Sequence, residues 1–199
     1  MDIDTVYACR RASLECLSVA LQGRDAHTRT HCDRVVALAD ELGRHCSLAE
    51  KDLRHLYVAA LFHDVGKIGV PDRVLLKRDP LSAEDWVLMK EHSTFGEELF
   101  LATGHDLALE VAPLIRHHHE SFDGRGYPDG LDGERIPLAC RVLALVDAYD
   151  AITNTRPYHA ARSHETAMGM LENEVDRKFD PAVFDTFSRM IDGSAARAP

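Results

Sequence analysis

Four segments of this 199-residue chain repeat apolar residues at helical spacing, and each places a histidine or an aspartate on its apolar stripe. The residues that interrupt the stripes are His31, His63, Asp64, His118 and Asp147. A polar side chain buried without a partner is costly, so these residues must find partners inside the fold. The pattern therefore constrains the chain to helices whose apolar faces surround several polar groups.

Two readings of these residues stay open at this level. A single histidine on an apolar stripe is more often a core residue that hydrogen-bonds a neighbour. Four helices that share the feature favour a common metal site, and adjacent residues on a helix point about 100° apart, so the His63-Asp64 pair could reach two metals or bracket one. A mixed nitrogen and oxygen ligand set suits Fe, Mn, Co or Zn better than Mg or Ca.

Composition and patterning predict an all-α fold with one domain of about eight helices. Hydrophobic residues make up 45% and charged residues 28%, as in ordinary globular domains, and no segment shows convincing strand alternation. The expected helices are 4–22, 27–42, 47–64, one that starts at 82, 106–120, 137–153, 164–175 and 181–191. We expect the first helix, within residues 1–24, to pack on the domain or to form a dimer. Residues 25–192 form the main domain, and 193–199 should fray.

Local signals set the expected helix ends. Gly43 is placed to cap the second helix, and Ser47 with Glu50 forms a capping-box pattern for the third. Asp180 is the expected N-cap of the last helix, followed by Pro181 at its first position. Residues 121–135 are rich in glycine and read as an ordered loop.

Charge and cysteine content limit the class of protein. A net charge of −10 argues against a protein that coats nucleic acid. The longest apolar runs are far shorter than the ~20 residues of a membrane helix, and the first residues show no signal-peptide pattern. Five cysteines without CxxC spacing predict free thiols, and hence a cytoplasmic location.

Longer motifs carry a resemblance to a known family. The string HDVGKIGVPD begins at His63, and HHESFDGRGYPDGLDGERIP occupies 118–137. The strings HTRTHCDRV, MKEHSTFG, VDAYDAIT, RPY and KFDP accompany them. Over about residues 25–190, the chain resembles the HD-GYP subgroup of the HD superfamily of metal-dependent phosphohydrolases. The resemblance implies an HD-type helical bundle with a glycine-rich GYP loop.

The resemblance also implies an activity. The subgroup cleaves the bacterial second messenger cyclic di-GMP to linear pGpG, or on to GMP, with a hydroxide that bridges two metal ions. We therefore expect two divalent metal ions as cofactors, with Fe or Mn favoured and Zn, Co or Ni compatible.

Matching the motifs residue by residue assigns expected roles. The expected metal ligands are His31, His63, Asp64, His92, His118, His119 and Asp147. Asp64 and Lys67 are the expected catalytic residues, with Asp64 bridging the metals and Lys67 touching the scissile phosphate. Tyr127, Pro128 and Arg156 are expected to line the substrate site.

One position departs from part of the family. Some members have a glutamate four residues before the helix-two histidine, where it supports a third metal, and this chain has His27 there. An imidazole cannot bridge two metals as a carboxylate can, so we favour two metals. Asp150 and Glu120 are candidates for outer support of the ligands.

Two other functions and several partners remain as alternatives. The chain could be an HD phosphohydrolase for another nucleotide or cyclic dinucleotide, or a cyclic di-GMP receptor or interaction module without turnover. The GYP loop argues against the first alternative, and the intact ligand set argues against the second. The partners to consider are a second copy of the chain, bound through the first helix, and a regulatory protein or diguanylate cyclase.

Overall fold

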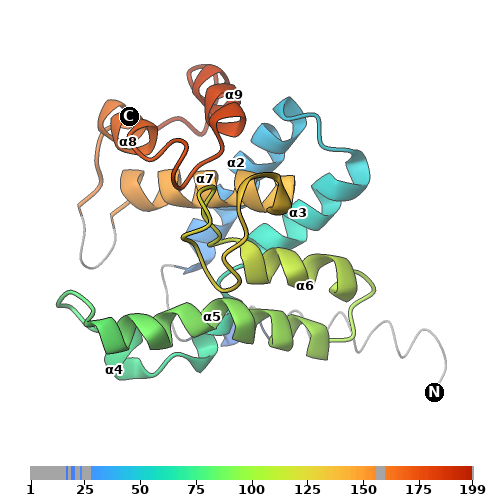
Figure 1. Ribbon diagram of the computed structural model, residues 1–199, viewed down its shortest axis with the longest axis vertical. Coiled ribbons are helices and arrows are strands. Elements are labelled where there is room, and N and C mark those ends of the chain that lie inside the picture. The colour runs from blue at the N-terminus through green and yellow to red at the C-terminus, as the bar shows by residue number, and fades with distance from the viewer. Residues whose placement is uncertain (1–16, 18, 21–22, 24–27, 156–159, 199) are drawn as a thin grey trace.

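The computed structural model describes residues 17, 19–20, 23, 28–155 and 160–198. Within 28–155 and 160–198 the chain forms eight α-helices, which confirms the all-α prediction (Figure 1). They are α2 (Thr28–His45), α3 (Glu50–Phe62), α4 (Asp72–Leu75), α5 (Ala83–Ala102), α6 (Ala108–His117), α7 (Leu138–Thr153), α8 (His164–Glu172) and α9 (Pro181–Ile191). Two short 3-10 helices, η1 (Val65–Gly69) and η2 (Gly133–Arg135), join them.

Helix α7 is the centre of the fold. Its residues Val142, Leu143, Leu145 and Val146 are fully buried, and it packs against α2, α3, α8 and α9 (Figure 1). A helix that is apolar on most of its circumference must be covered on most sides. The other helices therefore wrap α7, and a second group made of α5, α6 and η1 packs together below it in the view.

A glycine lets η1 lie directly on α5. A Cβ atom on Gly66 would stand 1.8 Å from the backbone oxygen of His92 and 2.6 Å from the backbone nitrogen of Gly96. No side chain larger than hydrogen fits such an approach of two backbones. This contact places the start of η1, with Asp64 and Lys67, beside His92.

The glycine-rich segment 121–135 is an ordered loop, with η2 near its end. Asp123 and Asp132 form an isolated antiparallel bridge. The N–H groups of Phe122 and Asp123 donate to the backbone oxygens of Lys178 (3.2 Å) and Arg177 (2.8 Å). The loop is thereby attached to the α8–α9 connection and crosses in front of α7 (Figure 1).

Several expected helix ends are correct. Ser82 and Asp85 form a reciprocal capping box at the start of α5. Asp180 accepts hydrogen bonds from the backbone of Ala182 and Val183, and Pro181 is the first residue of α9. Local capping signals therefore predict both starts.

Other expected ends are wrong for identifiable reasons. Helix α2 continues past Gly43, because this glycine makes room for α3: a Cβ there would stand 2.8 Å from Leu53 Cδ2. Ser47 has a φ of 60° and makes no cap, and Ala49 is the N-cap of α3. Helix α3 ends at Phe62, and Asp64 precedes η1, whereas we expected one helix to Asp64.

The C-terminal tail, which we expected to fray, makes two hydrogen bonds to the domain: the Ser194 hydroxyl donates to Glu41 (2.6 Å) and the Ala198 N–H donates to Tyr149 (3.0 Å). Most of the expected first helix, within 1–24, lies outside the described residues. Cys32, Cys46 and Cys140 carry free thiols. Among the described helices, none combines the length and apolar character that a bilayer crossing requires.

The contact between η1 and α5 generates a first prediction. Gly66→Ala should lower the free energy of unfolding by about 3 kcal/mol or more, because two backbones must separate. Thermal denaturation followed by circular dichroism measures this. The matched control is Gly169→Ala in α8, where nothing lies within 4 Å of an added Cβ. The control should be neutral or stabilising by up to about 1 kcal/mol. Equal melting temperatures for both variants would contradict the close contact.

Candidate metal centre

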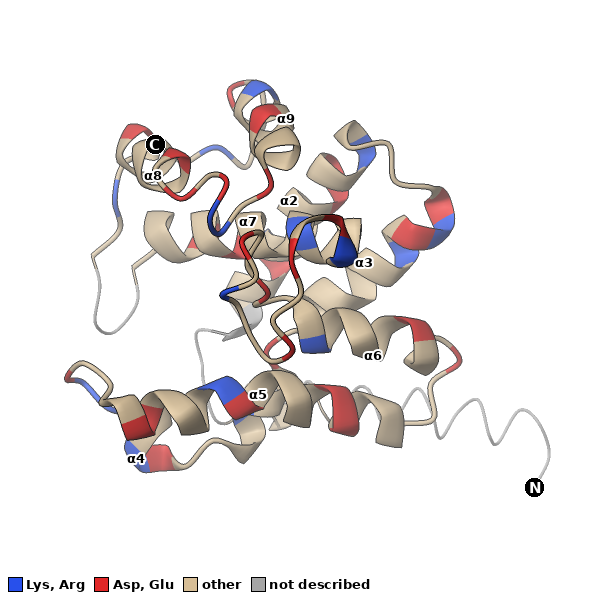
Figure 2. Cartoon of the chain, viewed as in Figure 1, with Lys and Arg blue, Asp and Glu red and all other residues tan. Residues whose placement is uncertain are grey.

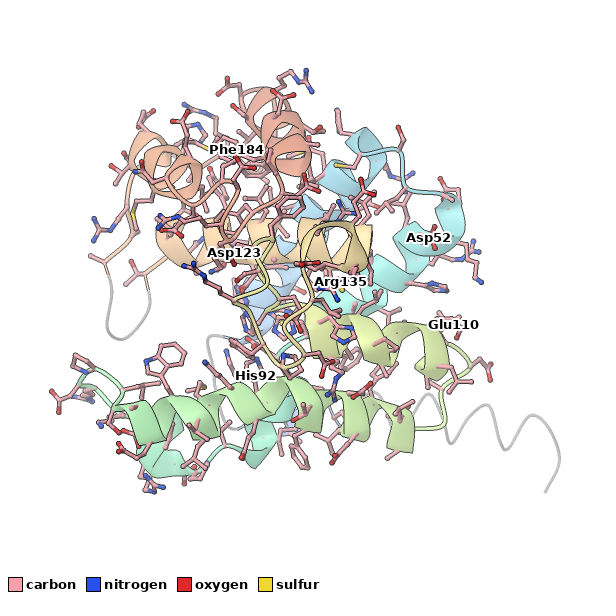
Figure 3. All side chains as sticks on the ribbon, in the orientation of Figure 1. Asp52, His92, Glu110, Asp123, Arg135 and Phe184 are labelled. Atoms are coloured by element: carbon pink, nitrogen blue, oxygen red, sulfur yellow. The ribbon has the colours of Figure 1, made fainter. Side chains whose placement is uncertain are left out.

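Histidines and aspartates from five helical regions converge in two groups. One group contains His31, His63 and Asp64, and the other contains His92, His118 and His119. Within each group, the candidate ligand atoms all lie within 4.8 Å of one another. Figure 3 shows His92 on the side of α5 that faces α7. The structure thus brings together residues that are up to 88 positions apart in the sequence (31 to 119).

Asp64 lies between the two groups. Its Oδ2 is 3.5 Å from His63 Nε2 and 3.9 Å from His31 Nε2, while its Oδ1 is 3.8 Å from His92 Nε2. Asp147 faces the first group, with Oδ1 3.3 Å from His31 Nε2 and 3.9 Å from His63 Nε2. Each oxygen of Asp64 therefore faces a different group of imidazoles.

Three of the histidines have their tautomer set by the backbone. His63 Nδ1 lies 2.8 Å from the Ala60 oxygen, His92 Nδ1 lies 2.6 Å from the Met89 oxygen, and His118 Nδ1 lies 2.6 Å from the Ile115 oxygen. A carbonyl oxygen only accepts, so each Nδ1 carries the hydrogen. In a neutral ring, Nε2 then holds the lone pair.

The lone pairs of His92 and His118 point at one another, with His92 Nε2 3.4 Å from His118 Nε2. In the other group, His31 Nε2 lies 3.3 Å from His63 Nε2. Burial lowers the pKa of His92, and burial with the nearby His63 and His92 lowers the pKa of His118 to about 3. A shared proton is therefore disfavoured between His92 and His118, whereas a divalent cation would satisfy both nitrogens. The donor set fits metal ions.

The Nδ1 side of His31 is held by a carboxylate, which is held in turn by an arginine. Its Nδ1 lies 2.7 Å from Asp150 Oδ2, and Arg34 donates to Asp150 through Nε (2.5 Å) and Nη2 (3.0 Å). Burial lowers the pKa of His31, but its bonds with Asp147 and Asp150 outweigh burial and raise it to about 9. Asp150 therefore fixes the orientation of His31, a candidate ligand. Sequence reasoning missed Arg34, although it lies three residues after His31, one turn along the same helix.

Lys67 offsets the negative charge of Asp64. Its Nζ donates to Asp64 Oδ2 at 2.7 Å, and its side chain is 19% exposed. Burial raises the pKa of Asp64, but Lys67, His63 and His92 outweigh this and hold it well below its usual value. Asp64 is therefore an anion at neutral pH, and Lys67 places an ammonium group beside it where solvent can still enter.

Tyr127 lies next to the second group, and Pro128 follows it in the loop. The Tyr127 ring centroid is 4.9 Å from that of His119, and the Tyr127 N–H donates to the His119 oxygen at 3.2 Å. Lys90 of α5 places its Nζ 5.2 Å from the Tyr127 ring centroid, a cation–π contact. The GYP loop is thus the wall of the candidate centre on this side.

Glu120 has a different place from the one we expected. It is 2% exposed, and its two carboxylate oxygens accept the backbone N–H groups of Asp129 (2.8 Å) and Leu131 (3.1 Å). Its partners are therefore in the loop, and it organises the loop around Tyr127. The sequence gives little sign of this, because the partners are backbone groups nine and eleven residues away.

A third cluster of ligand-type residues is better explained as an ion-pair network than as a metal site. His117, Glu120 and Asp129 meet there, but Arg116 binds both oxygens of Asp129 at 2.7 and 2.8 Å. Arg116 also reaches Glu97 of α5 at 2.8 Å. A guanidinium already supplies the cation, so the cluster fastens the loop to α5 and α6. His117 also pairs with Asp129, at 2.8 Å.

Two expected residues cannot be placed. His27 and Arg156 lie outside the described residues.

Comparison with known proteins places the chain among HD-domain proteins. The profile of the family described as HD domain matches residues 15–183. The cyclic di-GMP phosphodiesterase response regulator RpfG of Xanthomonas campestris pv. campestris is 38% identical over 180 residues, which cover 90% of this chain and 47% of that protein. The 3′3′-cGAMP-specific phosphodiesterase 3 of Vibrio cholerae is 30% identical, over 90% of this chain and 40% of that protein. The chain spans less than half the length of these relatives.

The fold has solved counterparts. An HDG"Y"P protein from Bdellovibrio bacteriovorus superimposes with a TM-score of 0.68, over 96% of this chain and 65% of that chain, at 20% identity. At this identity the likeness concerns the fold.

The arginine behind His31 generates a second prediction. Arg34→Gln should weaken divalent-metal binding by about 10-fold, and Asp150→Ala by about 10- to 100-fold, because both loosen His31. The affinity is measured from the amount of metal that each variant retains at increasing concentrations of a chelator. Arg44→Gln on the same helix, where Arg44 pairs with Asp40 at the surface, is the control and should leave metal binding unchanged. If Arg34→Gln behaves like the control, Arg34 does not support the ligand.

Proposed function

The chain belongs to the HD-domain family, with the motifs of its HD-GYP group, and on that premise we propose that it is a metal-dependent phosphodiesterase that hydrolyses cyclic di-GMP to linear pGpG. The observation that carries the proposal is the position of Asp64, whose two oxygens face two separate groups of imidazoles with Lys67 alongside. The name of a relative that is 38% identical supports the substrate.

Each group of side chains would hold one divalent ion. The first ion would bind His31, His63, Asp64 and Asp147, and the second would bind His92, His118, His119 and Asp64. The mixed imidazole and carboxylate set suits Fe or Mn, and Zn, Co or Ni are compatible. When bound, two such ions lower the pKa of a water molecule and offset the negative charge of a phosphodiester.

The chain's own residues would position and stabilise the reacting phosphate. Water adds to phosphorus, the bond from phosphorus to the ribose 3′ oxygen breaks, and a proton passes to that oxygen. The Lys67 ammonium, beside Asp64, would hydrogen-bond a phosphoryl oxygen and stabilise the added charge. Tyr127, Pro128 and Arg156 would line the substrate site, with Tyr127 held at its place by the His119 carbonyl.

Another cyclic dinucleotide is the second candidate substrate. A relative that is 30% identical bears the name of a 3′3′-cGAMP-specific phosphodiesterase. Purified, metal-loaded protein incubated separately with cyclic di-GMP, 3′3′-cGAMP and cyclic di-AMP distinguishes the candidates. Cyclic di-GMP should give the highest kcat/KM. Tight binding without turnover at any candidate metal would instead indicate a receptor.

The place of action and the partners complete the proposal. Free thiols at Cys32, Cys46 and Cys140 suit the cytoplasm, where cyclic dinucleotides are made and degraded. A second copy of the chain could bind through residues 1–24, and a regulatory protein or diguanylate cyclase could control turnover.

The roles of Asp64 and Lys67 give a third prediction. Asp64→Ala should abolish turnover and remove the metals, because both ions lose a shared anionic ligand. Lys67→Ala should keep the metals and lower kcat by about 100-fold or more, the cost of one transition-state donor. Elemental analysis and a turnover assay on the same samples measure both effects. Loss of metal from Lys67→Ala as complete as that from Asp64→Ala would refute this division of roles.

The metal count gives a fourth prediction. A neutral imidazole at position 27 has one lone pair to offer, so the protein should hold two metals per chain and release pGpG as its main product. His27→Glu should raise the count towards three. Elemental analysis of anaerobically purified protein measures the count, and three metals in the unmodified chain would contradict the prediction.

A further inference from the structure

A groove with a cavity volume of about 410 Å³ lies between α7 and the connection from α8 to α9. Its apolar walls include Ala151 and Ile152 of α7, Leu171 of α8 and Phe179. Glu174 and Lys178 bring charged groups to the same groove. Figure 2 shows acidic and basic residues side by side along this connection. Pockets for small ligands commonly have this size and this mixture of apolar walls and few polar groups.

Two elements connect the groove with the candidate metal centre. Its α7 wall begins at Ala148, which directly follows Asp147, and Ala151 lies one helical turn beyond Asp147. On the other side, the backbone oxygen of Lys178 accepts the N–H of Phe122, three residues after His119. A ligand whose phosphate reached the metal centre could extend another part of itself into the groove.

The charged groups match one kind of nucleobase. Guanine presents two neighbouring donors, N1–H and N2–H, and two acceptors, O6 and N7. A carboxylate can accept both donors, and an ammonium can donate to the acceptors. Arg177 already donates to Glu174 Oε1 at 3.0 Å, which fixes the carboxylate and leaves lone pairs on both oxygens. Lys178 lies over the ring of Phe179, with its Nζ 5.3 Å from the centroid.

We propose that this groove binds one guanine base of the cyclic dinucleotide, with Glu174 accepting from the N1–H and N2–H groups and Lys178 donating to the O6 side. The inference rests on the proposed function and deepens it, because it assigns base recognition to residues outside the candidate metal centre. Adenine would place the lone pair of its N1 against the Glu174 carboxylate. The groove therefore selects guanine over adenine.

Two variants test the groove. Glu174→Gln keeps the size of the side chain and replaces one acceptor oxygen with a donor. It should raise the KM for cyclic di-GMP about 10-fold and leave kcat within about twofold, since the metal centre is untouched. It should also lower the ratio of kcat/KM for cyclic di-GMP to kcat/KM for cyclic di-AMP. Lys178→Met should also raise the KM for cyclic di-GMP. Glu172→Gln, on a neighbouring exposed residue that does not line the groove, is the matched control and should match the wild type.

Binding measurements separate this inference from the proposed function. Calorimetric titration with cyclic di-GMP gives a Kd that needs no turnover, and circular dichroism confirms folding of each variant. If the wild type binds cyclic di-GMP without hydrolysing it, the proposed function fails, while weaker binding by Glu174→Gln still supports the groove. If turnover is intact and both variants keep the wild-type KM, Kd and base preference, the groove assignment is overturned and the proposed function stands.

Discussion

The Asp64 carboxylate, buried between two groups of imidazoles, is the interaction on which the rest of the structure depends. An anion in this place needs compensating positive charge, and the Lys67 ammonium lies 2.7 Å away, with the Nε2 atoms of His63 and His92 within 4 Å. Helices α2, α3, α5, α6 and α7 each deliver one or more of the converging groups. Their packing must therefore satisfy the polar centre as well as the apolar core. Much of the compensation for burying these groups would come from bound ions rather than from the protein.

Backbone carbonyl oxygens orient three of the histidines around this centre. Ala60, Met89 and Ile115 each lie three residues before the histidine that they hold, so one helical turn fixes each ring. His31 differs, because its outer partner is Asp150 from a distant helix, secured in turn by Arg34. The glycine-rich loop has its own supports, with Glu120 inside it and Arg116 at its base. The candidate metal ligands and the glycine-rich loop therefore have different supports, which meet where the Tyr127 N–H donates to the His119 oxygen.

The sequence predicts the helices and the convergence of the ligand-type residues, because both follow from local periodicity and from motifs whose order is specific. Ser82 and Asp180 are predictable caps for the same reason, since each contacts backbone two or three residues away. The roles predicted for Gly43 and Glu120 are wrong, because the contacts that define their roles come from residues that are not their neighbours in the sequence. A glycine that ends a helix and one that admits a neighbouring helix look alike in sequence. Likewise, a carboxylate after two histidines looks like a metal support until the loop is folded around it.

Anomalous diffraction from crystals of the metal-loaded protein, recorded on both sides of the metal's absorption edge, tests the central claim most directly. The account predicts two peaks per chain, one on each side of the Asp64 carboxylate, with each peak about 2.0–2.3 Å from the Nε2 atoms of its own imidazole group. A single peak, or peaks that leave Asp64 unliganded, would contradict the account.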